Sequence, residues 1–219
     1  MHAQTTRKDH PVLNQHQILR LSAGFSRVVF GIPVCGLGFS NYMNVPLPAI
    51  PSFACGLILI FWGIGTLYTV RPVSAAWDRK VSTAFALAML QLYFIPFLYW
   101  WLAVPTVVFY AVNVLAMAIT VTWLLIILNH LAAEFASLCE DDYFKVEALL
   151  CAWLTMGLLV TLFAGMTGYL LVHYVHAGEA SLPRMKLYPW LIAVLIMPFT
   201  LTLTSMYKCW KKCGKLVEM

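Results

Sequence analysis

Residues 129–150 read NHLAAEFASLCEDDYFKVEALL, and this polar stretch interrupts a long apolar part of the chain. It contains five of the nine acidic residues, namely Glu134, Glu140, Asp141, Asp142 and Glu147. Apolar runs without charged residues flank it on both sides. The stretch is therefore either a site that binds a metal or a proton, or the hydrated turn between two membrane helices.

The composition of the whole chain decides its class. Of the 219 residues, 62% are hydrophobic and 11% are charged, and the mean hydropathy is +0.81. A soluble domain of this length would carry about a quarter charged residues. We therefore expect an integral membrane protein with one membrane domain and no separate soluble domain.

Apolar runs predict an all-α fold, a polytopic bundle of about six transmembrane helices. A helix needs about 20 apolar residues to cross roughly 30 Å of hydrocarbon. Five uncharged runs are long enough: 52–70, 81–104, 106–129, 148–172 and 187–207. Turn residues or charges separate these runs, so each is expected to form its own span.

A sixth span is expected near residues 21–40, where Arg27 and Pro33 interrupt the apolar run. The uncharged part, 28–39, would rise only about 18 Å as a helix. The segment crosses if the Arg27 side chain extends to the headgroups. Otherwise residues 21–70 form a re-entrant hairpin bent near 44–51. We favour the span.

The basic residues orient the predicted bundle. With six spans and a cytoplasmic N-terminus, twelve of the fourteen Lys and Arg residues face the cytoplasm, and only Arg184 and Lys186 lie outside. This bias predicts that both termini are cytoplasmic. We accordingly expect a polar segment at 1–20, a membrane domain at 21–207 and a basic tail at 208–219. The net charge of +5 then faces a membrane surface, not nucleic acid.

The location follows from the same features. No cleavage pattern of a signal peptide follows the N-terminal residues, so we expect none to be removed. A plasma membrane or a bacterial inner membrane is the expected location.

Cys209 and Cys213 stand among lysines, and nearby positive charge lowers a thiol pKa, so these are predicted to be the most reactive cysteines. A disulfide framework is not expected.

Polar residues inside the spans are few. Apart from Arg27, no Asp, Glu, Lys or Arg lies between the predicted headgroup zones, which argues against an ion-coupled carrier. Gln91 and Asn113 are uncharged polar residues in the third and fourth spans. They could line a polar pathway, but hydrogen bonding between helices is the favoured interpretation.

Small residues mark two helix faces. Gly157, Thr161 and Gly165 recur at intervals of four in the fifth span, and Gly168 is close by. The second span carries a similar pair, and it consists of Gly56 and Gly63. Such faces let another helix approach closely. They serve either packing within the bundle or contact with a partner subunit, and the sequence leaves both open.

Histidines and carboxylates offer weak metal candidates. His173, His176 and Glu179 follow each other at intervals of three at the outer end of the fifth span, and could form part of a zinc site. Haem is disfavoured, because outside the N-terminal segment the other histidine is His130, at the opposite membrane face. We expect no metal and no cofactor.

The acidic stretch itself is interpreted as a hydrated helix–turn–helix. His130 and Glu134 share a helix face, but the other carboxylates are bunched in a turn, which suits a metal poorly. Either of Asp141 and Asp142 is expected to cap the fifth helix. A docking surface for a basic cytoplasmic partner over 134–147, centred on Glu140 and the two aspartates, is the functional alternative.

These observations favour a non-enzymatic structural or assembly subunit of a membrane complex, which packs against other subunits or copies of itself. The alternative is a small channel or carrier for a neutral or apolar solute, built around Gln91 and Asn113. A membrane redox or metal-dependent enzyme using His130, Glu134 or the cysteines is a distant third.

Overall fold

A computed structural model describes residues 14–37, 49–70, 74–104, 107–177 and 189–218. Over these ranges all regular secondary structure is helical. The six helices are α1 (Gln15–Leu37), α2 (Ala49–Tyr68), α3 (Ala75–Ala103), α4 (Val108–Leu138), α5 (Asp142–Ala177) and α6 (Pro189–Glu218). The predicted all-α fold is thus confirmed for the described part of the chain.

Four helices contain segments long and apolar enough to cross a membrane. These segments are Gln15–Gly36, Ala75–Trp101, Val112–Leu138 and Asp142–Thr161, and a shorter apolar segment covers Ser52–Tyr68. A membrane bundle is therefore supported. The count of six crossings and the cytoplasmic placement of both ends remain predictions.

Helix α1 begins earlier than the sequence pattern indicated. It runs for 23 residues from Gln15 as one helix that includes Pro33, which corresponds to about 34 Å at ~1.5 Å per residue. The expected start was residue 21, which placed Arg27 near a helix end. In the structure Arg27 lies in the middle of α1 instead.

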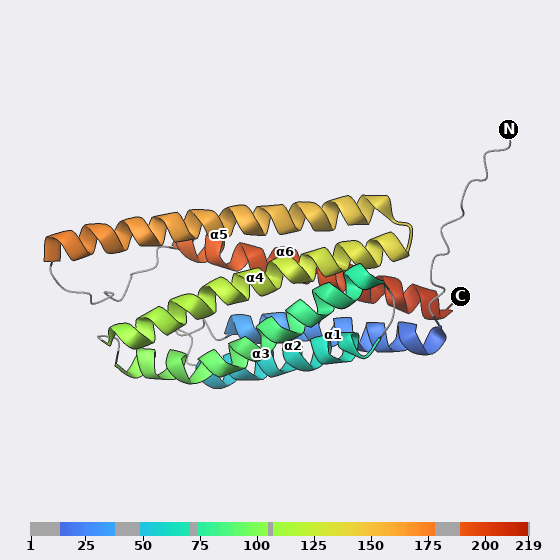
Figure 1. The fold of residues 1–219 in the computed structure, drawn as a ribbon. Coiled ribbons are helices and arrows are strands. Elements are labelled where there is room, and N and C mark those ends of the chain that lie inside the picture. The colour runs from blue at the N-terminus through green and yellow to red at the C-terminus, as the bar shows by residue number, and fades with distance from the viewer. Residues whose placement is uncertain (1–13, 38–48, 71–73, 105–106, 178–188, 219) are drawn as a thin grey trace.

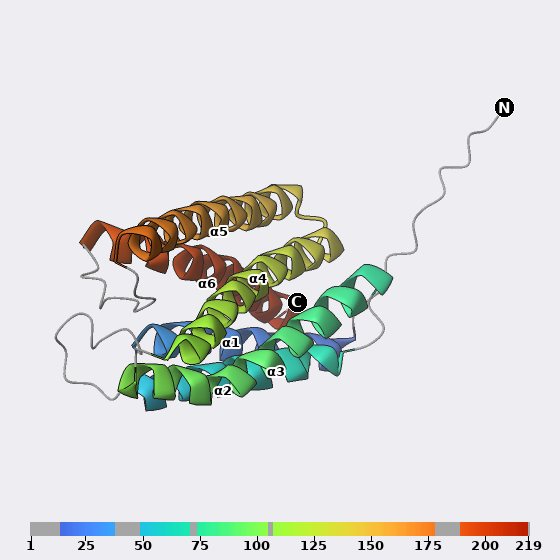
Figure 2. The ribbon, with the colours of Figure 1, turned by 60° about the vertical axis from the view of Figure 1, so that its left-hand side comes forward.

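The helices form an elongated antiparallel bundle (Figure 1). The start of α1, the end of α6 and the turn between α4 and α5 lie at the same end of it (Figure 1). Helix α1 packs against α2 and α6, and α4 packs against α3, α5 and α6. Helix α5 lies on the outer side of α4 and α6 (Figure 2).

Glycines bring α1 and α2 into close contact. A Cβ added at Gly56 would lie 2.4 Å from the Cys35 backbone nitrogen, and one at Gly63 would lie 2.8 Å from the Gly24 carbonyl oxygen. A Cβ at Gly31 would lie 2.9 Å from the Gly56 carbonyl oxygen. The two backbones therefore approach where both helices lack side chains, as small residues permit in membranes.

Helix α6 does not end where the apolar run ends. Residues 208–218, expected as a basic tail, continue the helix as far as Glu218. Met206, Cys209 and Cys213 are fully buried on one face of it, at the spacing of successive helical turns. The lysines among them lie on other faces, so an amphipathic segment packs onto the bundle. Phe30 of α1 contacts Trp210 of this segment, with ring centroids 5.9 Å apart.

Candidate functional site

The acidic stretch forms a tight turn between α4 and α5. Glu140 adopts a positive φ of 53°. Its N–H donates to the Ser137 carbonyl at 3.3 Å, and the Asp141 N–H donates to the Ala136 carbonyl at 3.0 Å. This pair of bonds is the Schellman arrangement, which satisfies the free carbonyls at a helix end and usually places glycine where Glu140 stands.

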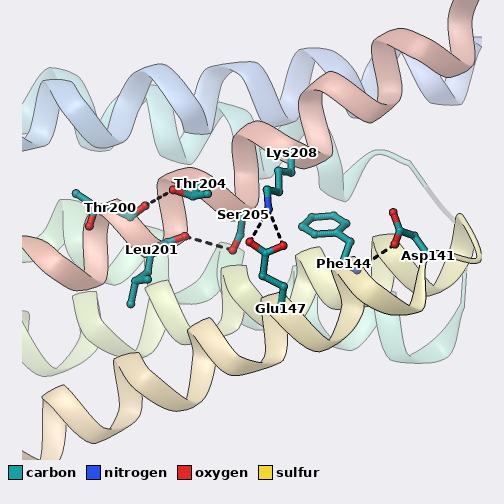
Figure 3. Close-up of polar contacts among 8 residues, drawn as sticks. All are labelled: Asp141, Phe144, Glu147, Thr200, Leu201, Thr204, Ser205 and Lys208. Carbon is teal, nitrogen blue, oxygen red and sulfur yellow. Dashed lines mark hydrogen bonds and ion pairs between the residues drawn. The ribbon is translucent and has the colours of Figure 1, made fainter.

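Asp141 starts the next helix. Its Oδ1 accepts a hydrogen bond from the Phe144 N–H at 3.0 Å (Figure 3), and its carbonyl accepts from the Lys145 N–H at 3.0 Å. Asp141 is therefore the N-cap of α5, as predicted. The hydrogen bond from Lys212, together with that from Phe144, lowers the pKa of the Asp141 carboxyl.

Three ion pairs gather at this end of the bundle. Lys80 of α3 pairs with Glu134 of α4, Lys208 of α6 pairs with Glu147 of α5, and Lys212 of α6 pairs with Asp141 in the turn. The amine of Lys208 contacts both carboxylate oxygens of Glu147 (Figure 3). We call these three pairs the ionic belt.

The ionic belt ties together helices that are distant in the sequence. Its side chains keep between 26% and 42% of their surface exposed. Pairs this exposed contribute about 0–1 kcal/mol each. Their main effect is therefore to specify which helix faces meet, because a slipped arrangement would leave lysines and carboxylates without partners.

The predicted docking surface is only partly available. Asp141, Glu134 and Glu147 already pair with lysines of the same chain. Glu140 and Asp142 are exposed. Docking of a basic partner at this turn stays a prediction.

The metal candidates are not brought together. Among the described residues, no three His, Cys, Asp or Glu side chains are placed to hold a metal ion. His173 and His176 lie on α5, but their side chains are outside the described part, and so is Glu179. His130 and Glu134 lie together on α4, where Glu134 is engaged by Lys80.

Buried polar residues form separate contacts between helices. Gln91 is fully buried, and its amide nitrogen donates to the Thr120 hydroxyl of α4 at 2.6 Å. Asn113 donates to the Phe109 carbonyl of its own helix at 2.8 Å. The two predicted polar residues therefore do not meet.

A third buried amide has a partner that the sequence analysis missed. The Asn129 amide nitrogen of α4 donates to the Thr202 hydroxyl of α6 at 2.9 Å. Both residues are fully buried. The signal available in the sequence was an amide at the first position of the stretch 129–150, but nothing there identified Thr202 as its partner.

The two small-residue faces differ in their surroundings. Gly56 and Gly63 are buried against α1. Gly157, Thr161, Gly165 and Gly168 are exposed on α5. A Cβ added at any of those three glycines would have no neighbouring atom within 4 Å. Nothing in the described chain covers this face of α5.

The prediction that Cys209 and Cys213 are the most reactive cysteines is wrong. Both are fully buried. Burial raises the pKa of Cys209 well above its ordinary value, and raises the pKa of Cys213 to about 12. The neighbouring lysines do not reverse this, because loss of solvation outweighs their attraction for a thiolate.

Comparisons with known proteins found no family model, no curated protein and no solved structure that matches this chain.

Proposed function

We propose that this chain is a non-enzymatic subunit of a membrane complex and that the outer face of α5 packs against a helix of a partner. The observation that carries the proposal is the open face formed by Gly157, Thr161, Gly165 and Gly168. Similar glycines in α1 and α2 are used for contact between helices of the same chain.

The physical argument rests on how helices associate in lipid. Burying apolar side chains gives little advantage there, because lipid is equally apolar, so association depends on close packing. Large exposed side chains such as Tyr143, Leu150 and Trp153 occupy the first half of the outer face of α5. Beyond them Gly157, Thr161, Gly165 and Gly168 form a strip of small exposed residues beside Val160, and this strip allows a partner helix to approach closely.

The connections between helices support a role without catalysis. Helices α3 and α4 are joined through residues 104–107, and α4 and α5 through residues 139–141. Such connections leave no room for a catalytic domain between these helices. The described polar residues at membrane depth contact other helices or their own backbone.

The proposal is tested by measuring the mass of the protein extracted gently from its own membrane. We expect a particle well above the 24.7 kDa of one chain, with other chains attached. Gly165→Leu should release the partner, because its side chain would occupy the contact face. Gly36→Leu is the matched control, since Gly36 is also exposed with no atom within 4 Å of an added Cβ.

Two results would contradict the proposal. One is a wild-type particle containing a single copy of this chain, and finding a small molecule bound to it would favour the channel or carrier. The other is a partner that remains attached equally in both leucine variants.

A further inference from the structure

We propose that α1 carries a binding site for the phosphate group of an anionic phospholipid, with Arg27 as its main ligand. The site consists of Arg20, Arg27 and Phe30 of α1 with Trp62 and Thr66 of α2, and we call it the arginine site. It does not depend on the proposed function.

Helix α2 holds the Arg27 side chain in one orientation. The guanidinium carbon of Arg27 lies 4.2 Å from the centroid of the Trp62 ring, and the Nη1 of Arg27 donates to the Thr66 hydroxyl. That hydroxyl donates in turn to the Trp62 carbonyl at 2.9 Å. A guanidinium has five N–H donors and Thr66 takes one, so most of its capacity is left for another acceptor.

The arginine site lacks a counter-charge from the described chain. Residues 14–37 and 49–70 contain no Asp or Glu. The ion pairs formed among the described residues use lysines, and neither Arg20 nor Arg27 takes part in them. A partly buried cation beside apolar side chains is stabilised by an anion, and a phosphate matches the planar guanidinium fork.

The site lies near the level of the ionic belt, where charged side chains of α3, α4, α5 and α6 gather. Phe25, two residues before Arg27, contacts Phe135 of α4 with ring centroids 5.2 Å apart. Phe135 follows Glu134 of the ionic belt, so Arg27 lies within about one helical turn of that level. Arginine and tryptophan together are typical of the membrane interface. The predicted orientation places this end in the cytoplasmic leaflet, which carries anionic lipids.

The flanking side chains favour a lipid over a soluble phosphate. Trp62, which stacks on the Arg27 guanidinium, and Phe30, about one turn after Arg27 on α1, expose 58% and 59% of their surface. Acyl chains can cover such apolar surface, whereas free phosphate cannot. Arg20 is also exposed and lies two turns before Arg27 on the same helix face, where it provides a second cation.

The test uses the full chain in mixed micelles that contain equal amounts of phosphatidylglycerol and phosphatidylcholine. Native mass spectrometry measures the ratio of the two lipids retained on the protein. Arg27→Gln should lower the preference for phosphatidylglycerol roughly five-fold, the effect typical of one basic residue near an anionic surface. Arg79→Gln is the matched control, because Arg79 is an exposed arginine on α3 and its loss changes the net charge equally.

Several results would overturn the inference. Equal losses in the Arg27→Gln and Arg79→Gln variants would indicate general attraction to charge. Displacement of the retained lipid by millimolar inorganic phosphate would show that the ligand is a soluble anion. If Arg27→Gln fails to fold by circular dichroism, Trp62→Leu keeps the charge but removes the ring that orients it, and an unchanged lipid preference would then refute the site.

Discussion

Replacing Gly56 by alanine tests the α1–α2 contact most directly. The new Cβ would lie 2.4 Å from the Cys35 nitrogen, 2.5 Å from the Cys35 sulfur and 2.8 Å from the Gly31 carbonyl oxygen. Ordinary contacts begin near 3.4 Å, so the helices must separate by about 1.0 Å, the difference between 3.4 and 2.4 Å. Two of the three atoms belong to the backbone and cannot turn away.

The expected loss of stability follows from these distances. Overpacking of this kind costs about 1–3 kcal/mol, whereas alanine gains at most about 1 kcal/mol over glycine in helix propensity. Gly56→Ala should therefore destabilise the protein. Gly63→Ala should destabilise the protein less, because the nearest atom to the new Cβ, the Gly24 carbonyl oxygen, is 2.8 Å away. Gly157→Ala should be neutral or stabilising, because no atom lies within 4 Å of its new Cβ.

The assay is reversible unfolding of the detergent-solubilised protein in a denaturing detergent, followed by circular dichroism. The order of stability should be Gly157→Ala, then wild type, then Gly63→Ala, then Gly56→Ala. If Gly56→Ala is as stable as Gly157→Ala, the close approach of α1 and α2 is not what holds this pair together, and the reasoning fails.

Three further predictions concern the end of the bundle that carries the ionic belt. A double-mutant cycle on Lys208→Met and Glu147→Gln should give a coupling below about 1 kcal/mol, since both side chains are partly exposed; a coupling above about 2 kcal/mol would refute this. The pKa of Asp141 is lowered in the folded state, so its contribution to stability is present above its ordinary value of 3.8 and is lost as the pH falls through the folded pKa. Asp141→Asn should therefore flatten the acid side of the stability profile, and an unchanged slope would argue against this contribution. A maleimide should label the buried Cys213 only after unfolding, as mass spectrometry of the labelled peptide can show; rapid labelling of Cys213 in the folded protein would contradict the packing of α6.

Much of the helix pattern could be predicted from local features. Long uncharged runs indicated helices, and the acidic stretch indicated a turn with an aspartate cap, which the hydrogen bond between Asp141 and Phe144 confirms. Local sequence suffices for these features because backbone hydrogen bonds within lipid must be satisfied inside each segment. The ends of helices were predicted less well, as the early start of α1 at Gln15 and the extension of α6 to Glu218 show.

The contacts of the site could not be predicted in the same way. Lys208 and Lys212 lie four residues apart on one helix, and the sequence suggested only a basic tail there. The structure places them beside Glu147 and Asp141, which are more than sixty residues away. Partners at this distance along the chain depend on which helices are neighbours, and composition does not contain that information.

That this protein is apolar, helical and interrupted by charge at 134–147 follows from residue type and spacing alone. How equivalent residues are used depends instead on the packing of the helices. Gly56 is buried against α1, whereas Gly157, also a glycine on a small-residue face, remains open on α5. Cys213, surrounded by lysines in the sequence, is buried in the bundle. The physical reason is that burial depends on the neighbouring helix, and the arrangement of all six helices selects that neighbour.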